Sequence, residues 1–136
     1  MPDTGRLVPV PDDETAGFFE AARRHELAIR VCSRCGATLH LPRSWCARCR
    51  AGDTEWRVVS GDARLYSWTT VMQSPHPAFE CPYTVVLAEL SEHPEVRLVG
   101  YLPGEPELEP GMALEIRFDD IGDGMTLPQF VPVVGR

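Results

Sequence analysis

The sequence contains no lysine. All thirteen basic residues are arginine, and twenty acidic residues give the 136-residue chain a formal net charge of −7. This charge argues against broad binding to a phosphate backbone, which needs positive charge along the binding surface. No apolar run approaches the roughly 20 residues that a membrane-spanning helix requires. We therefore expect a soluble protein with no membrane partner. The N-terminus MPDTGRLVPVPDDE has no basic start followed by an apolar stretch, so it predicts no signal peptide and a cytoplasmic location.

Cysteine is scarce too, and four of the five cysteines fall in one segment. CSRCGATLHLPRSWCARC, residues 32–49, contains two C-x-x-C pairs separated by ten residues. Each pair can turn two sulfurs toward one point, and four converging thiolates suit the tetrahedral coordination of zinc, at Zn–S distances of about 2.3 Å. The predicted ligands are Cys32, Cys35, Cys46 and Cys49. Because four cysteines leave no open position for water or substrate, we interpret this zinc as structural and not catalytic.

Two disulfides, or a redox-active C-x-x-C, are the alternative interpretations of these cysteines. A reducing cytoplasm disfavours disulfides, and redox motifs normally occur singly. The separation between the pairs is, however, shorter than the usual range for such zinc sites. The fifth cysteine, Cys81, stands before Pro82 with no activating histidine beside it, so we interpret it as a packing residue and not a nucleophile.

Positive charge is concentrated around the cysteine segment. Six arginines and two acidic residues lie between positions 27 and 57, a surplus of four positive charges that leaves −11 on the rest of the chain. This remains the only basic region after four thiolates and one Zn²⁺ are added. Arg34 and Arg48 could meet the phosphates of CoA directly, without an enzyme partner. Solvated charges on a small module are the simpler interpretation.

A helix is predicted after a proline-containing leader at residues 2–11. Asp12 or Asp13 can accept hydrogen bonds from the first free N–H groups, and apolar residues then recur at helical spacing. The adjacent Phe18 and Phe19 can pack on their own domain or dock to a partner subunit, and the sequence does not decide between these uses.

Short β-branched and aromatic runs separated by turn residues predict strands from residue 27 onward. Residues 27–31 should enter the first cysteine pair, with residues 38–41 as their return. Further strands are expected at residues 56–60, 63–73, 83–90, 96–102 and 112–118, with a terminal extended piece around 130–134. Five or six short strands without an intervening helix suggest a closed or nearly closed barrel, most simply an OB-fold.

The predicted fold class is therefore mostly β, with an N-terminal helix, a zinc ribbon and an OB-fold barrel. The expected domains are residues 1–26 for the leader and helix, 27–55 for the zinc ribbon and 56–136 for the barrel.

Two loops are candidates for binding. SPHPAFECP, residues 74–82, is longer than a hairpin connection needs, so we expect a contact surface that includes Pro75, His76, Pro77 and Phe79. His76 could act as a general base, but no partner carboxylate or nucleophile lies at a meaningful spacing, and we predict no catalytic residue. The acidic segment FDDIGDG lacks the ligand alternation of a calcium loop and is interpreted as a turn between strands.

Several motifs occur in a fixed order: the paired aromatics Phe18 and Phe19, the four cysteines, Trp56, VSGDARLYSWTTV, PYTVVLAEL and the closing LPQFVPV. With these motifs nearly the whole chain resembles a family of acyl-CoA-associated proteins, in which a rubredoxin-like zinc ribbon precedes an OB-fold. This family was long catalogued as a domain of unknown function. The chain departs from the family pattern in having Phe18-Phe19 instead of Phe-Trp, and HEL before the ribbon instead of a glycine-containing turn.

The resemblance implies an accessory role. Members assemble with thiolases, with thiolase-like aldolases that act on steroid side-chain CoA esters, with hydroxymethylglutaryl-CoA synthases and with some enoyl-CoA hydratases. We therefore expect a non-catalytic subunit of an acyl-CoA-processing hetero-oligomer. It would contain a structural zinc, and a thiolase-like partner would make or break the carbon–carbon bond. A CoA ester could be bound jointly with that partner. The residues expected to contact the partner or acyl-CoA are Phe18, Phe19, Arg34, Arg48, Pro75, His76, Pro77 and Phe79.

Two alternatives remain. The first is an accessory subunit of an enoyl-CoA hydratase. The second is a nucleic-acid-binding module of OB-fold and zinc ribbon, which the arginine cluster favours. Acidic residues in the predicted strands oppose the second alternative, since a binding groove for phosphates needs positive charge.

Overall fold

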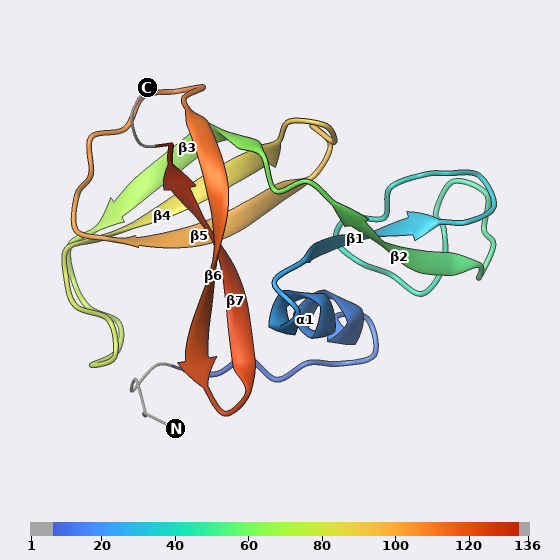
Figure 1. Ribbon diagram of the computed structural model, residues 1–136, viewed down its shortest axis with the longest axis horizontal. Helices are drawn as coiled ribbons and strands as arrows, with labels where there is room; N and C mark the ends of the chain where they lie inside the picture. Colours follow the sequence, from blue (N-terminus) through green and yellow to red (C-terminus); the bar gives the residue numbers. More distant parts are fainter. Residues whose placement is uncertain (1–6, 134–136) are drawn as a thin grey trace.

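The computed structural model describes residues 7–133, which contain one helix and seven strands. The elements are α1 (Ala16–Arg23), β1 (Leu27–Cys32), β2 (Thr54–Val59), β3 (Ala63–Val71), β4 (Tyr83–Leu90), β5 (Arg97–Pro103), β6 (Ala113–Gly122) and β7 (Met125–Pro132). In Figure 1 the small sheet of β1 and β2 projects from one side of a larger sheet, and α1 lies between β1 and β7. The predicted mostly-β fold class with an N-terminal helix is confirmed. Positions 1–6 of the predicted leader, and position 134, lie outside the described residues.

Helix α1 begins one turn after the Asp12 carboxylate that the sequence predicted as its cap, and its N-cap residue is Thr15, which makes no side-chain capping hydrogen bond. The Asp12 side chain accepts hydrogen bonds from the backbone N–H groups of Glu14 and Thr15, at 3.0 and 2.9 Å. These contacts form a turn ahead of the helix, which starts at Ala16. Phe18 packs against the barrel core, which is one of its two predicted uses, and its contact with a partner stays a prediction. Within residues 7–133, no helix is long and apolar enough to cross a membrane.

The partner of β1 differs from the prediction. Residues 38–41 form no return strand and contribute only an isolated bridge between Val31 and Thr38. Strand β1 pairs instead with β2 in antiparallel register along six residue pairs, and β2 crosses the predicted boundary between residues 55 and 56. The physical reason is that Pro42 cannot donate to a ladder, while the side chains of Thr38 and His40 bond to the barrel.

The larger sheet has the strand order β5-β4-β3-β6-β7, with antiparallel neighbours. Strand β3 pairs with β4 along its length but with β6 only at Ala63 and Arg64, because a bulge between Leu65 and Ser67 bends it. The observed bounds of β2, β3, β4 and β5 agree with the predicted ones to within two residues. Inward-facing residues from all five strands meet in one core, and Leu27, Ile29 and Val31 of β1 belong to the same cluster.

Only the end of the acidic segment FDDIGDG, which the sequence analysis interpreted as a turn, forms the turn. Strands β6 and β7 form a hairpin whose turn is Asp123-Gly124, with φ angles of 53° and 73°. Positive φ at both positions is typical of a two-residue hairpin turn. Asp119 and Asp120 lie in β6 and pair with residues of β7, so the last strand starts at Met125 and not near residue 130.

The barrel closes without a complete ring of backbone ladders. Strands β5 and β7 approach each other, and the side chain of Gln129 accepts a hydrogen bond from the N–H of Tyr101 at 2.7 Å. Gln129 is only 3% exposed. A Cβ added at Gly100 would lie 3.3 Å from the backbone nitrogen of Phe130, which shows how closely the two strands pass. A buried side-chain amide therefore replaces strand pairing at this seam.

Trp56 holds the helix against the small sheet. The indole covers Gly17 of α1 so closely that a Cβ at this position would overlap the ring. The guanidinium of Arg30 lies over the indole at 5.1 Å from a ring centroid, and it also donates to the hydroxyl of Thr54 at 2.6 Å. A cation over an aromatic ring is attractive, so Arg30 and Gly17 together limit where Trp56 can move.

This contact predicts that Gly17→Ala destabilises the protein, although glycine-to-alanine replacement in a helix normally stabilises by about 1 kcal/mol. The added methyl group has no space beside Trp56, and overpacking of this kind costs about 1–3 kcal/mol. Urea unfolding followed by tryptophan fluorescence measures the change. Gly52→Ala is the matched control, because a Cβ at Gly52 meets nothing within 4 Å. Equal or higher stability of Gly17→Ala would contradict the packing described.

Candidate functional site

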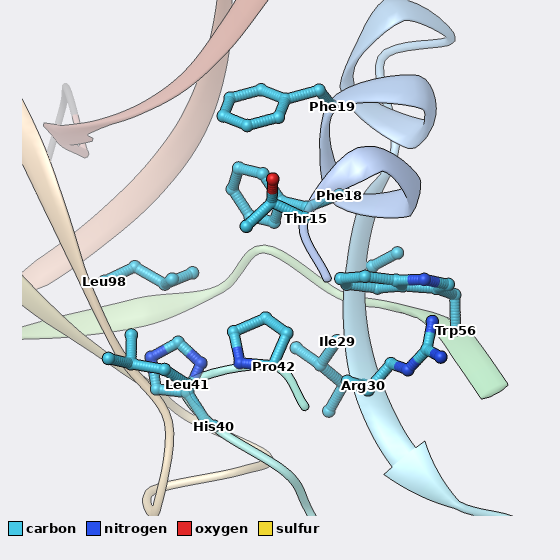
Figure 2. Close-up of a pocket in the computed structure, with 11 residues that line it drawn as sticks. Thr15, Phe18, Phe19, Ile29, Arg30, His40, Leu41, Pro42, Trp56 and Leu98 are labelled. Atoms are coloured by element: carbon cyan, nitrogen blue, oxygen red, sulfur yellow. The ribbon is translucent and has the colours of Figure 1, made fainter. Parts of the chain in front are cut away.

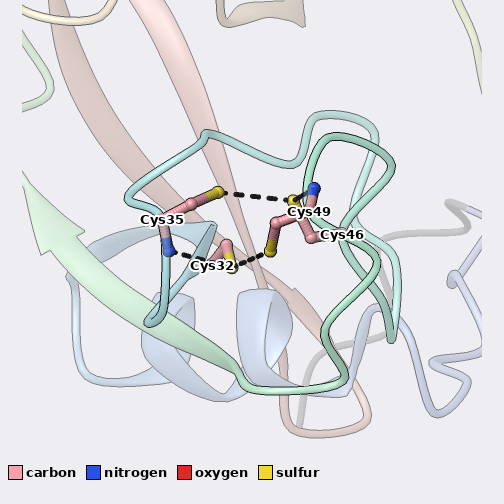
Figure 3. A group of neighbouring side chains, drawn as sticks. All are labelled: Cys32, Cys35, Cys46 and Cys49. Carbon is pink, nitrogen blue, oxygen red and sulfur yellow. Dashed lines mark hydrogen bonds between the residues drawn. The ribbon is translucent and has the colours of Figure 1, made fainter.

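The four predicted zinc ligands converge in the loops at the end of the small sheet (Figure 3). Their sulfur atoms all lie within 4.8 Å of one another. The sulfurs of Cys32 and Cys49, and those of Cys35 and Cys46, are each 3.6 Å apart. A tetrahedron with Zn–S bonds of 2.3 Å has sulfur–sulfur edges of about 3.8 Å, whereas a disulfide requires about 2.05 Å. The cluster is therefore positioned to bind a metal ion, and the donor set fits zinc.

Backbone N–H groups in each loop donate to ligand sulfurs. The N–H of Cys35 lies 3.4 Å from the sulfur of Cys32, and the N–H of Cys49 lies 3.4 Å from that of Cys46. The N–H of Cys49 is the main cause that lowers the pKa of Cys46 to about 6, and the N–H of Cys35 likewise lowers the pKa of Cys32. At Cys49 the N–H of Ala51 lowers the pKa, but burial and the other three thiols raise it to about 11. A bound cation would allow all four thiolates to coexist.

Two hydrogen bonds tie the metal loops to the barrel. The hydroxyl of Thr38 donates to the carboxylate of Glu95 at 2.7 Å, and the Nε2 of His40 donates to the carbonyl of Arg97 at 3.0 Å. The Thr38 contact is the main cause that lowers the pKa of Glu95. Because Glu95 and Arg97 belong to the β4–β5 connection and to β5, the ribbon is attached to the barrel at a second place besides β1.

The two ribbon arginines singled out from the sequence have different surroundings. Arg48 donates to the carbonyl of Cys35 at 2.9 Å, so it joins the two cysteine loops to each other. Arg34 is exposed and makes no ion pair within residues 7–133. Contact of either residue with acyl-CoA stays a prediction.

An apolar cavity of about 200 Å³ lies where the helix, the ribbon and the barrel meet (Figure 2). Both predicted helix residues, Phe18 and Phe19, form one wall, and Trp56 and Leu98 face them from β2 and β5. Leu41, on the ribbon side, is 74% exposed and marks the rim. Sequence reasoning found the two phenylalanines but missed Leu41, Pro42 and Leu98, whose approach depends on the ribbon folding back onto β5.

A second cavity of about 360 Å³ follows the seam between β5 and β7. Phe79 of the predicted binding loop lines it and packs on Tyr83 and Tyr101, with ring centroids 5.5 and 6.0 Å away. Phe18 lines this cavity as well as the first one. Two residues selected separately from the sequence, one on the helix and one in the loop, are thus brought to a common cavity.

The remaining loop residues have structural contacts or face solvent. Pro75 and Pro77 are exposed, and His76 is half-buried. The Nδ1 of His76 accepts the N–H of Ala78 at 3.0 Å, and the hydroxyl of Ser74 donates to the carbonyl of Phe79 at 2.7 Å. His76 therefore shapes the loop that holds Phe79. A role for Pro75, His76 and Pro77 in partner binding stays a prediction.

Comparison with known proteins identifies both parts of the chain. The family "ChsH2, rubredoxin-like zinc ribbon domain" matches residues 19–55, and the family "ChsH2, C-terminal OB-fold domain" matches residues 56–119. A solved structure titled "Ltp2-ChsH2(DUF35) aldolase" contains a chain with 35% sequence identity and a TM-score of 0.85. The match covers 93% of this chain and 99% of that one.

Two further relatives are more distant or longer. A DUF35-family protein of unknown function from Sulfolobus solfataricus shows the same fold at 18% identity, with a TM-score of 0.62 over 89% of this chain and 86% of that one. A "Probable enoyl-CoA hydratase alpha subunit" from Thermomonospora curvata is 34% identical over 135 residues, which is 98% of this chain. The chain spans only 42% of the length of that relative.

The cluster predicts that Cys32→Ser or Cys46→Ser abolishes tight zinc binding, since each change removes one thiolate of four. Elemental analysis of the purified variants measures the metal, and thermal unfolding should show loss of the ribbon, because metal binding and folding are coupled in such modules. Cys81→Ser is the matched control and should keep full zinc content. An unchanged melting curve after chelation, with no zinc in the wild-type protein, would refute the site.

The Thr38–Glu95 contact predicts an acid-sensitive attachment of the ribbon. The lowered pKa of Glu95 means that its contribution to stability is present above the pKa of the unfolded chain and is lost as the pH falls through the lower folded pKa. Glu95→Gln should therefore flatten the loss of stability on acidification, measured by urea unfolding from neutral to acidic pH. Glu92→Gln is the control. Identical pH profiles for Glu95→Gln and the wild type would contradict this.

Proposed function

Because the chain belongs to the ChsH2 family, in which a rubredoxin-like zinc ribbon precedes an OB-fold domain, we propose that it is the accessory subunit of an acyl-CoA-processing complex. Its partner is a thiolase-like enzyme that makes or breaks a carbon–carbon bond in a CoA ester. The observation that carries the proposal is the similarity to the Ltp2-ChsH2(DUF35) aldolase over 93% of the chain.

The metal cluster supports an accessory role. Four cysteines would fill the coordination sphere of a zinc ion, so no position remains at which water or a carbonyl oxygen could be activated. When bound, the zinc supplies rigidity and no catalytic chemistry. Cys32 is the last residue of β1, whose Leu27, Ile29 and Val31 pack in the barrel core. The metal would therefore hold the ribbon in a constant position relative to the barrel.

The exposed apolar residues near the cavities support docking to a partner. Leu41 and Val99 are 74% and 66% exposed, and Phe19 lies on the wall of the first cavity. Exposed apolar groups that gather around a recess commonly mark an interaction site. The residues come from the ribbon, from β5 and from α1, so the surface exists only when these three parts are assembled.

The second candidate function is an accessory subunit of an enoyl-CoA hydratase. It is favoured by the 34% identity to the probable enoyl-CoA hydratase alpha subunit. The two candidates share the accessory role and differ in the partner. Co-expression with a thiolase-like protein and, separately, with a hydratase-type protein from the same genome distinguishes them by which one co-purifies.

The proposal predicts that the thiolase-like protein encoded near this chain co-purifies with it and needs it for solubility or full activity. Phe19→Ala should weaken the complex by about tenfold or more, as is usual for an aromatic residue at an interface centre. Titration calorimetry measures the affinity, and Val58→Ala, at an exposed position outside both cavities, is the control. Full activity and solubility of the thiolase-like protein without this chain would overturn the proposal.

A further inference from the structure

One edge of strand β5, which we call the free edge, carries no backbone ladder in the part of the chain that the structure describes, although β7 passes close to it at Gly100 and Tyr101. Within residues 7–133 the backbone ladder of β5 is formed with β4 alone. The hydrogen bonds from Leu90 N–H to Val96 and from Gly104 N–H to Pro82 mark the two ends of this antiparallel register. They show that even-numbered residues of β5 direct their N–H and C=O groups toward β4, since the two groups of one residue point to the same side.

The odd-numbered residues of β5 must then direct their main-chain groups to the free edge. Two contacts agree with this. The carbonyl of Arg97 accepts from His40, and the N–H of Tyr101 donates to Gln129. Val99 lies between these two positions, and neither its N–H nor its C=O has a hydrogen-bond partner in the described part of the chain. Val99 thus presents one main-chain donor and one main-chain acceptor at this edge, and neither is hydrogen-bonded within the described residues.

This open pair lies between the two apolar cavities. Leu98, on one side of Val99, lines the cavity at the ribbon, while Val99 itself and Tyr101 line the cavity at the seam. Phe18 forms part of both walls. An extended peptide is complementary to this arrangement. One of its residues can pair its N–H and C=O with those of Val99, and the neighbouring residues can place apolar side chains in the two cavities.

We propose that an extended segment of the partner subunit adds to β5 at Val99, exchanging two main-chain hydrogen bonds with it and placing apolar side chains in the flanking cavities. This rests on the proposed function, since the occupant is the partner. His40 and Gln129 already occupy the positions on either side, so the added strand is short. Its specificity comes from the side chains that enter the cavities.

Charge and continuity favour the partner subunit over a second copy of this chain. A second copy would bring together two molecules of charge −7. Like charges of this size oppose self-association. The cavity beside Leu98 is also lined by the exposed Leu41 and by Phe19, which already belong to the proposed docking surface. A short strand addition is too small to hold a complex alone, and here it would form the centre of a larger apolar contact.

Amide hydrogen exchange on the unmodified protein tests the proposal directly. The Val99 N–H should exchange rapidly in the isolated chain and at least about tenfold more slowly in the complex with the thiolase-like protein, because the bond is made only there. The N–H of Gly52, in the ribbon loop, is the internal control and should not change. Three results would overturn the proposal: no protection of Val99 in the complex, protection by CoA alone, or protection that rises with the concentration of this chain alone.

A pair of variants tests the same bond by affinity. Val99→Pro removes the edge N–H, and proline is tolerated where a strand edge faces solvent. Val99→Ala keeps the N–H and loses part of the side chain. Val99→Pro should bind the partner at least about tenfold more weakly than Val99→Ala, with unchanged zinc content and melting temperature. Equal binding by both variants would overturn the strand addition and leave the proposed function standing. Absence of binding by the wild type would overturn both.

Discussion

The structure depends on one strand that belongs to two units. Alternate residues of β1, Leu27, Ile29 and Val31, pack in the core of the barrel, and the next residue, Cys32, is a member of the metal cluster. The opposite face of the same strand carries Arg30, which holds Trp56 against α1. Because successive side chains of a strand point to opposite faces, one short segment sets the relative positions of barrel, ribbon and helix. Neither cavity beside Phe18 would exist if these three parts moved independently.

The metal cluster and the apolar surface around the first cavity lie in different parts of the molecule, and the fold connects them physically. The cluster lies at the Cys32 end of the small sheet, while the exposed Leu41 lies at the cavity that α1, the ribbon loop and β5 line together (Figure 2). The contacts of Thr38 and His40 with Glu95 and Arg97 connect the two regions. A structural change at the metal cluster would therefore move the loop that carries Leu41, and so would alter the shape of the proposed docking surface. In the proposed complex, a zinc ion at the cluster would therefore stabilise the geometry of the docking surface, and its loss would weaken partner binding without any direct contact between zinc and partner.

Local patterns in the sequence predicted most elements, and long-range pairing accounts for the errors. The spacing of Cys32, Cys35, Cys46 and Cys49 predicted the cluster, and β-branched runs placed β3, β4 and β5 to within two residues. The predicted strand partner of β1 was wrong. Whether β1 pairs with residues 38–41 or with β2 depends on where the ribbon loop contacts the barrel, which is a long-range interaction. The start of β7 was missed because the short turn Asp123-Gly124 left Thr126 and Leu127 looking like loop residues. The accessory role was predicted from the family resemblance, while the cavities and the free edge at Val99 arise only from the tertiary arrangement, because residues distant in the sequence form them.

Because a side chain and not a backbone ladder closes the seam between β5 and β7, the barrel should open more easily at some strand borders than at others. Strands β3 and β4, and strands β6 and β7, share long ladders, whereas β3 pairs with β6 at only two residues and the Gln129 side chain bonds β7 to β5 in place of a ladder. The five-stranded sheet therefore has two well-paired parts, β5-β4-β3 and β6-β7, whose common borders have few backbone hydrogen bonds and depend mainly on the shared core. The lowest-energy opening of the barrel should separate these two parts as cooperative units, with β6 and β7 detaching as an intact hairpin. Phe130 of β7, which is fully buried in the core, would leave with the hairpin, and its removal would expose the interior of the barrel to solvent.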